Sequence, residues 1–352
     1  MNNQNTTRVQ VSQVKRVITT LFNSYGISEK DSEVITNSFI EADLCGVNTH
    51  GVTVVPAHIE KLKVGGYNIN PNIRKVREGI SFAVVDGDGS FGALSAEYSM
   101  KLAKEEAKQK GTFSVFSYNN NTFGPAFYYS AMAAKEGLIG IVMCNTPPAM
   151  APWNGNEKLL GTNPFSISIP VKKGFPITLD MATSQVAKSK INIALRDGKK
   201  IPIGWATDIN GDPTTDPQKA VEGMVLPLGG YKGYGISMMV DILSGVLSGA
   251  SFLNDVGSFY RNMENCMNVG FMFVVIDPKL IIGEVFYDLI KDYYNIIKSS
   301  SSVIKGDEIL IPGDRKSNFK KQFSDTGIEI NKETINKLNQ YLLENNINMK
   351  LA

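Results

Sequence analysis

Proton transfer at neutral pH is most readily carried by histidine, and this chain has two, His50 and His58. An imidazole titrates near neutrality, so a placed histidine can take a proton from a hydroxyl group or return it to a carbonyl oxygen. His58 falls within the helical pattern AHIEKL and is expected to be structural. A lone histidine is more often a satisfied structural residue than a catalytic one, so the sequence pattern alone leaves the role of His50, in NTHGV, open.

Two further charged residues have spacing that suggests a ligand site. Lys232 lies between glycines in GGYKGYG, just before an apolar helix, and glycines allow the backbone to approach a ligand closely. Asp180, followed by Met181 and Ala182 in LDMATS, ends a predicted strand. A free surface lysine and a helix-capping aspartate are the alternative interpretations.

The segment GDGSFG, with Gly87, Gly89 and Gly92, matches the dinucleotide fingerprint G-x-G-x-x-G between a predicted strand and a predicted helix. Asp86 and Asp88 would oppose the phosphates of a dinucleotide there. The next strand is also followed by no acidic residue that could bind a ribose hydroxyl. We therefore expect a tight turn rather than a Rossmann fold.

Composition excludes several other classes of protein. The chain has a formal net charge of +2 and no basic block, so nucleic acid is not an expected partner. Cys45, Cys144 and Cys266 are far apart, which argues against disulfides and, with two histidines, against a metal site. The polar N-terminus lacks the apolar core of a signal peptide, and the most apolar internal stretch contains Asp241. We expect a cytoplasmic protein without a membrane partner.

Hydrophobic periodicity predicts helices at both chain ends and strands in the centre. Residues 1–72 with 284–352 are predicted to form a helical domain, and residues 73–283 a central domain. The predicted strands are ISFAVVDG, TFSVFSY, GLIGIVMCN, FSISIPV, FPITLDM and MFVVID. The predicted helices lie within 8–43, 50–63, 93–110 and 186–196, from 284 to about 300, and from 332 onward.

Nine segments between residues 43 and 316 together resemble the type 2 malate/L-lactate dehydrogenase family. This family includes ureidoglycolate, sulfolactate and diketogulonate oxidoreductases. The segments, in chain order, are DLCGVNTHGV, VDGDGSFG, NNNTFGPAFYYS, NTPPAMAPWNG, LLGTNPFSISIP, LDMATS, GWATDINGDPTTDP, LPLGGYKGYG and IPGDRK. Each segment is a weak signal alone, but nine in register make the resemblance specific.

The resemblance implies the α/β, non-Rossmann malate/L-lactate dehydrogenase type 2 fold. In it, a central mixed, largely antiparallel sheet binds the cofactor and a helical domain comes from both chain ends. It also implies NAD or NADP as cofactor, a small-molecule 2-oxo or 2-hydroxy acid substrate, and a homodimer with its active site near the domain and subunit boundary. His50 then lies at the active site, and Lys232 against the nicotinamide cofactor. The other implied cofactor contacts are Thr146, Asp180, Met181, Ala182, Gly313 and Asp314.

Two positions depart from the family pattern. Thr122 in NNNTFG stands where relatives carry a catalytic histidine, and Val54 stands where they carry an arginine suited to a substrate carboxylate. A threonine hydroxyl cannot act as an acid or base at neutral pH, and losing a general acid typically costs about 10²–10⁴-fold in rate.

Three hypotheses accommodate these departures. In the first, His50 is the sole acid–base residue and the substrate carboxylate is held elsewhere, by Lys232 or by backbone donors. In the second, the substrate is a cyclic or N-alkyl imine, which when protonated needs no further proton during hydride transfer. In the third, the chain is a paralogue that binds dinucleotide with little turnover.

Overall fold

A computed structural model describes residues 5–304 and 306–352. Within them one large sheet forms from β2 (Arg74–Glu78), β3 (Phe82–Asp86), β4 (Thr112–Asn120), β5 (Ile139–Cys144), β6 (Phe165–Ile169), β7 (Ile177–Met181) and β11 (Val269–Ile276). Their spatial order is β2-β3-β4-β11-β5-β6-β7. In this described part, β3 and β4 are parallel and every other neighbouring pair is antiparallel. The predicted mixed, largely antiparallel sheet is confirmed.

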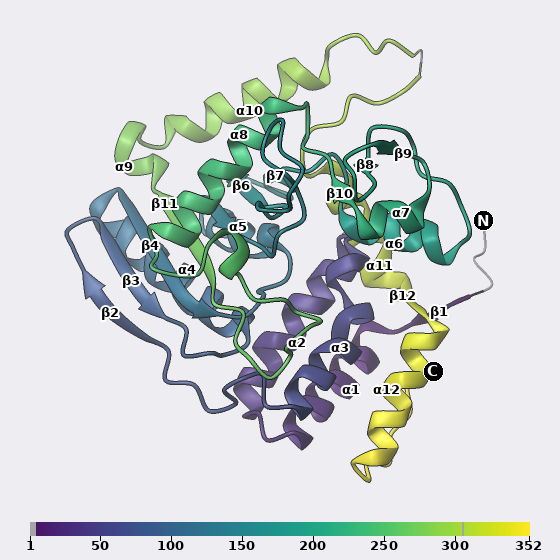
Figure 1. The fold of residues 1–352 in the computed structure, drawn as a ribbon. Coiled ribbons are helices and arrows are strands. Elements are labelled where there is room, and N and C mark those ends of the chain that lie inside the picture. The colour runs from purple at the N-terminus through teal and green to yellow at the C-terminus, as the bar shows by residue number, and fades with distance from the viewer. Residues whose placement is uncertain (1–4, 305) are drawn as a thin grey trace.

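The remaining elements surround this sheet (Figure 1). The short strands are β1 (Thr6–Val9), β8 (Ala206–Thr207), β9 (Pro213–Thr214), β10 (Met224–Val225) and β12 (Ile328–Asn331). The helices are α1 (Val11–Ser24), α2 (Glu29–Leu44), α3 (Val55–Lys63), α4 (Gly92–Lys110), α5 (Ala126–Lys135), α6 (Lys188–Arg196), α7 (Pro217–Glu222), α8 (Tyr231–Val240), α9 (Pro278–Ile282), α10 (Val285–Lys298), α11 (Asp314–Thr326) and α12 (Lys332–Glu344).

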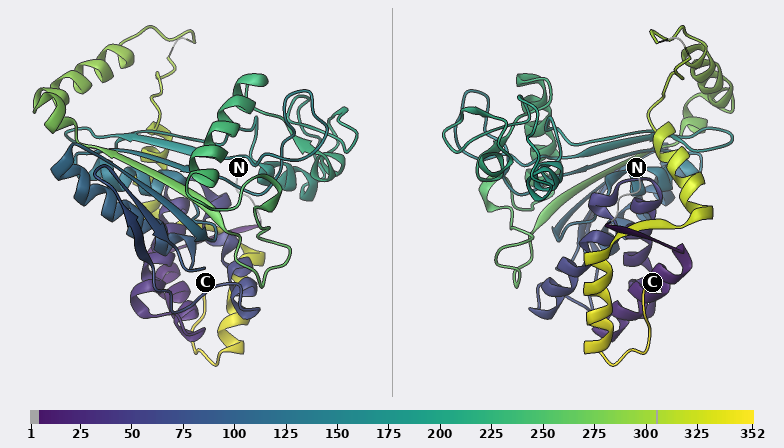
Figure 2. Two further views of the ribbon diagram at one scale, coloured as in Figure 1. Left: turned by 60° about the vertical axis from the view of Figure 1, so that its left-hand side comes forward. Right: turned by 90° about the vertical axis from the view of Figure 1, so that its right-hand side faces the viewer.

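Alternation along the central strands gives the sheet one tightly packed face. In β11, Phe271, Phe273 and Val275 are fully buried, and Val142 of β5 is buried beside them. Side chains at alternate positions of a strand point to the same face. These residues form one core with the apolar sides of α4 and α5, which lie along that face (Figure 2).

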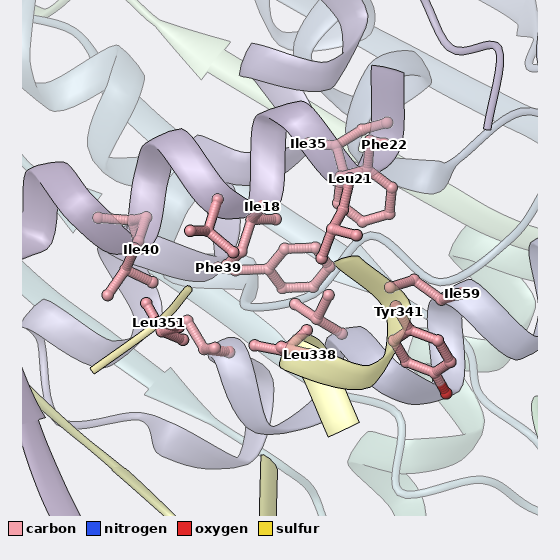
Figure 3. Packing of buried hydrophobic residues seen from close by; sticks show 14 of the residues in the cluster. Ile18, Leu21, Phe22, Ile35, Phe39, Ile40, Ile59, Leu338, Tyr341 and Leu351 are labelled. Carbon is pink, nitrogen blue, oxygen red and sulfur yellow. The ribbon is translucent and has the colours of Figure 1, made fainter. Parts of the chain in front are cut away.

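The two chain ends fold together as predicted. β1 and β12 pair antiparallel, with Thr6 opposite Asn331 and Val9 opposite Ile328. Figure 3 shows side chains from α1, α2, α3 and α12 meeting in one apolar core. Leu21 and Leu338, more than 300 positions apart in the chain, are both fully buried in it.

Helix α10 lies far from α1–α3 in both ribbon views (Figures 1 and 2), although residues 284–352 are predicted to belong with residues 1–72 to one helical domain. The hydroxyl of its Tyr287 donates to the Gly137 carbonyl just before β5, at 3.2 Å. The division of the chain into domains therefore stays a prediction, and this packing favours assigning α10 to the sheet.

The most apolar stretch of the sequence forms α8 followed by a π-helical turn, Asp241–Val246. Among the described helices, none combines the length and the apolar composition that a bilayer crossing requires.

Candidate active site along the edge strand β7

Strand β7 is one of the two edge strands of the large sheet, and it contains Asp180 and Met181 of the predicted site residues. Thr178 is buried and its hydroxyl lies 3.0 Å from that of Ser168, which in turn lies 2.8 Å from the hydroxyl of Ser130 in α5. Residues two apart on a strand share a face. Asp180 therefore points to the α5 side of the sheet rather than to the α8 side.

The carboxylate of Asp180 is paired with a cation from the other end of the chain. Lys316 Nζ of α11 lies 3.2 Å from Asp180 Oδ2, and both side chains are mostly buried. The same Nζ lies 5.0 Å from the ring centre of Phe127 in α5. The interpretation of Asp180 as a helix cap is wrong, because the next helix, α6, begins at Lys188 with Ala187 at its cap.

The segment before α11 is docked on the start of β7. The Thr178 amide donates to the Pro312 carbonyl at 2.8 Å. Gly313 has φ of 106°, and a Cβ there would lie 2.8 Å from the Pro176 carbonyl oxygen. Only glycine fits this close approach without strain. Gly313 thus holds the segment against the strand.

The Asp314 carboxylate has structural partners in this segment. Its Oδ2 accepts from the Ile311 amide at 2.9 Å and lies 2.6 Å from Lys298 Nζ of α10. The predicted cofactor contact of Asp314 stays a prediction, but this carboxylate already fixes the turn.

His50 ends a short 3₁₀ turn, Asn48–His50, that a buried carboxyl group holds in place. Asp43 at the end of α2 accepts from the Val52 amide at 2.7 Å and from Asn48 Nδ2 at 3.1 Å. A Cβ at Gly51 would lie only 2.0 Å from Asp43 Oδ1, so the turn closes tightly over the carboxyl group. Burial raises the pKa of Asp43 to about 7, against the opposing effect of its two donors.

Burial by the surrounding protein lowers the pKa of His50 below the ordinary 6.5, although the residue stays partly open to solvent. The Asp180 carboxylate acts in the opposite direction. The imidazole is therefore mainly neutral at pH 7 and able to accept a proton. The structure thus brings together His50 and Asp180, two residues that the sequence analysis placed separately.

His58 is buried in an aromatic cluster, as expected for a structural histidine. Its Nδ1 lies 2.7 Å from the Tyr67 hydroxyl, and the rings of Phe91 and Phe259 pack against it. Burial is the largest cause that lowers the pKa of His58 to about 3, so this side chain stays neutral.

A second group of predicted residues gathers around one buried asparagine. Asn163 has φ of 22° and is fully buried. Its Oδ1 accepts from the Thr146 amide at 3.0 Å, and its Nδ2 donates to the Ser237 carbonyl of α8 at 3.0 Å. The helix that carries Lys232 is thereby tied to Thr146.

The end of β7 joins the same group. The Thr183 amide donates to the Thr162 carbonyl at 2.9 Å, and the Leu228 amide donates to the Thr183 carbonyl at 2.9 Å. Met181 and Ala182, just before Thr183, are half-buried. They therefore lie beside the loop that carries Thr162 and the loop that leads from Leu228 into α8.

Lys232 is exposed near the start of α8 and lines a cavity of about 580 Å³. The other walls are apolar and come from the sheet and from α8, including Phe165, Ile167 and Ile236. A flat ring could lie on this surface with the ammonium group at its margin.

The glycine loop is a packed turn, as predicted. A Cβ at Gly87 would lie 2.0 Å from Asn120 Oδ1, and Asn121 Nδ2 donates to the Gly89 carbonyl at 3.1 Å. Thr122, half-buried, follows these asparagines, and its carbonyl oxygen would lie 2.5 Å from a Cβ at Gly92. Asparagine side chains thus fill the space that a pyrophosphate would need.

Three residues of this site were not assigned a role by the sequence analysis. Asp43, Asn163 and Lys316 all lie in segments that carry the family resemblance, but their partners are 5 to 136 positions away. For Asn163, the signal in the sequence is the residue type, because asparagine tolerates a positive φ better than most residues do. Nothing local identified Lys316.

Comparison with known proteins agrees with this architecture. The family model described as malate/L-lactate dehydrogenase matches residues 9–339. A malate dehydrogenase of Pyrococcus horikoshii is 41% identical over 288 residues, which cover 79% of this chain and 79% of the relative. A solved structure of sulfolactate dehydrogenase from Methanocaldococcus jannaschii superposes with a TM-score of 0.91 at 38% identity, over 97% of this chain and 98% of the other.

A third similar structure is that of a delta1-piperideine-2-carboxylate reductase from Pseudomonas syringae. It superposes with a TM-score of 0.85 at 25% identity and covers 95% of this chain and 99% of that one. On the sheet order, the site geometry and these matches, the chain belongs to the malate/L-lactate dehydrogenase family of hydroxy acid oxidoreductases.

Proposed function

We propose that this protein transfers a hydride between a nicotinamide dinucleotide and a small 2-oxo or 2-hydroxy acid, with His50 as the acid–base residue. The observation that carries the proposal is a mainly neutral, exposed imidazole held on a turn that Asp43 fixes, within electrostatic reach of Asp180. Such a group can accept a proton at neutral pH without having to lose one first.

The residues around β7 fit a dinucleotide chemically. A cavity of about 580 Å³ with a lysine at its margin suits a flat ring close to a phosphate, and its size is typical of ligand sites. Its residues Phe165 and Ile167 alternate with Ser168, which faces α5, so the cavity lies on the α8 face of the sheet, and a dinucleotide that also contacts Asp180 would pass over the edge strand β7. Thr146, Met181, Ala182, Lys232 and Gly313 would hold the cofactor, and Asp180 would accept hydrogen bonds from ribose hydroxyls. When bound, the nicotinamide supplies the hydride acceptor or donor.

This chain's own part in the reaction is to move one proton. In the oxidation, the substrate C–H bond breaks as the hydride leaves, the carbonyl forms, and His50 takes the hydroxyl proton on an imidazole nitrogen. In the reduction, His50 returns that proton to the carbonyl oxygen. Val54 cannot bind the substrate carboxylate, so a cation or backbone donors elsewhere in the site must do so.

The test is the oxidation of NADH or NADPH by pyruvate, oxaloacetate or glyoxylate, measured as the loss of nicotinamide absorbance. Turnover with an oxo acid that His50→Asn abolishes is the expected result. Tight dinucleotide binding with no turnover on any substrate would reject the enzymatic proposal and favour the paralogue hypothesis.

A second candidate is reduction of a cyclic or N-alkyl imino acid. Thr122 at the position of the expected second acid favours it, because a protonated imine needs no proton during hydride transfer. The similarity to the piperideine carboxylate reductase supports it as well. Piperideine-2-carboxylate in the same assay distinguishes this candidate, since its reduction should survive His50→Asn.

We also propose that the protein is a homodimer. Ile236, Met239, Ile242 and Val246 follow one another at steps of three and four along α8 and its π turn, and each is 41–47% exposed. Ile236 and Met239 also line the Lys232 cavity, so a partner on this stripe would lie at the margin of that cavity. A continuous apolar stripe of this kind on a surface marks an interface. Light scattering should give twice the 38.5 kDa chain mass, and Ile242→Glu should reduce it to the monomer.

A further inference from the structure

The segment before α11 that is docked on β7 also borders a second cavity. The lining of this cavity differs from that of the Lys232 cavity. It has a volume of about 640 Å³ and lies between the loop before β7, helix α10 and helix α11. It shares Ile311, Pro312 and Gly313 with a smaller cavity of about 380 Å³ that contains Asp180 and Lys316. The two cavities are therefore neighbours across the one segment that touches β7.

Among the residues that the structure describes, five lysines line the larger cavity. Lys298 is neutralised there, because its Nζ lies 2.7 Å from Glu308 and 2.6 Å from Asp314. Lys172 has a weaker pairing with Asp288, at 3.5 Å.

The other three come from three separate elements: Lys173 from the loop, Lys291 from α10 and Lys321 from α11. Within the described residues, no carboxylate lies within 4 Å of these three ammonium groups. The cavity thus has an uncompensated positive charge, which an anionic ligand would balance.

The cavity also has flat apolar surfaces. Phe175 and Tyr294 are half-buried and line it, and Lys298 Nζ lies 5.8 Å from the Tyr294 ring centre. Aromatic faces beside cations suit a planar base that carries a phosphate. The carboxylates of the described lining, Glu308 and Asp314, share Lys298, and the lysines that remain give the lining an excess of positive charge.

We propose that this cavity binds the adenosine end of the dinucleotide and that Lys173, Lys291 and Lys321 recognise a 2′-phosphate, so that the protein prefers NADPH to NADH. The inference rests on the proposed function, which places a nicotinamide dinucleotide along β7. From Met181 back to Ile177, where the larger cavity begins, a strand covers about 13 Å. The larger cavity and the Asp180 cavity share Ile311, Pro312 and Gly313 in their walls.

The experiment measures dissociation constants by nicotinamide fluorescence for NADPH and NADH, and by calorimetry for adenosine 2′,5′-bisphosphate and 5′-AMP. A charge-assisted contact to the 2′-phosphate should make NADPH bind about 10- to 100-fold more tightly than NADH. Adenosine 2′,5′-bisphosphate should exceed 5′-AMP in affinity by a similar factor. Lys173→Met with Lys321→Met should remove most of that ratio and leave NADH binding within about twofold. Lys30→Met, at an exposed site on α2, is the matched control and should leave the ratio unchanged.

Each other outcome has a defined meaning. Equal affinity for NADPH and NADH, or a ratio that the double lysine variant does not change, overturns this inference and leaves the proposed function standing. If the protein binds neither dinucleotide, the proposed function fails, and this inference fails with it.

Discussion

Replacing Asp43 with asparagine tests the account of how the His50 turn is held. The Asp43 side chain is 3% exposed and accepts two hydrogen bonds, from the Val52 amide and from Asn48. Burial raises its pKa from the ordinary 3.8 to about 7. The amide of the Asp43→Asn variant keeps a carbonyl oxygen of the same shape for the Val52 amide but has no titrating proton.

The sign of the effect follows from which state holds the proton. Between pH 4 and pH 7 the unfolded chain loses the Asp43 proton while the folded protein keeps it. The stability that this group contributes is therefore complete below pH 4 and is lost as pH rises through 7. One pKa unit corresponds to about 1.4 kcal/mol, and about two units are lost between pH 5 and pH 8, so the loss is about 2–3 kcal/mol.

Urea unfolding of both proteins at pH 5, 6, 7 and 8 measures this difference. The unfolding free energy of the wild type minus that of Asp43→Asn should fall by about 2–3 kcal/mol from pH 5 to pH 8. Asp325→Asn, which removes an exposed carboxylate from α11, should instead run parallel to the wild type. Parallel curves for Asp43→Asn as well would refute the buried, protonated carboxyl group.

Three further predictions concern the site itself. His50→Asn should lower turnover about 10²–10⁴-fold with an unchanged circular dichroism spectrum, and activity within tenfold of the wild type would reject His50 as the acid–base residue. Asp180→Asn removes the carboxylate that raises the pKa of His50, so NMR titration should show a lower pKa for that ring, and a higher one would contradict the assigned interaction. Gly313→Ala adds a close contact to backbone strain and should lower the free energy of unfolding, measured with urea, by about 1–3 kcal/mol. Its control is Gly111→Ala, where the backbone has φ of 84° and ψ of −36° but open space around it, and an equal cost for both would contradict the docking of residue 313 on β7.

Local pattern was enough to find most elements of the sheet. The apolar run MFVVID predicted β11, and the run ISFAVVDG predicted β3. Helix α11 was not predicted, because none of its residues is buried and it therefore has no apolar face that repeats along the chain. Strands β8, β9 and β10 are two residues long, too short for any periodicity.

Spatial neighbours were not accessible in the same way. β11 lies between β4 and β5, with Val274 opposite both Ser114 and Ile141, more than 130 positions earlier. Such pairings depend on which faces become buried together, a property of the whole fold rather than of any segment. The same holds for Asp180 and Lys316, whose pairing depends on how α11 returns to the edge of the sheet.

The same distinction between local pattern and spatial neighbours applies to the site residues. His50, Asp180 and Lys232 could be selected because their segments resemble a family. Asp43 was part of such a segment, but its role as the group that fixes the turn required the hydrogen bonds to be seen.

The two departures from the family pattern affect the charge of the site more than its fold. Val54 is half-buried against the helical core, so no cation reaches the site from that position. Lys316 is the cation paired with Asp180, so its charge is already shared with that carboxylate. A 2-oxo acid must therefore compete with Asp180 for Lys316 or use another cation, whereas a protonated cyclic imine has a positive charge of its own that Asp180 would attract. The ratio of oxo acid to imine turnover thus depends on that carboxylate, and Asp180→Asn should change it in favour of the oxo acid.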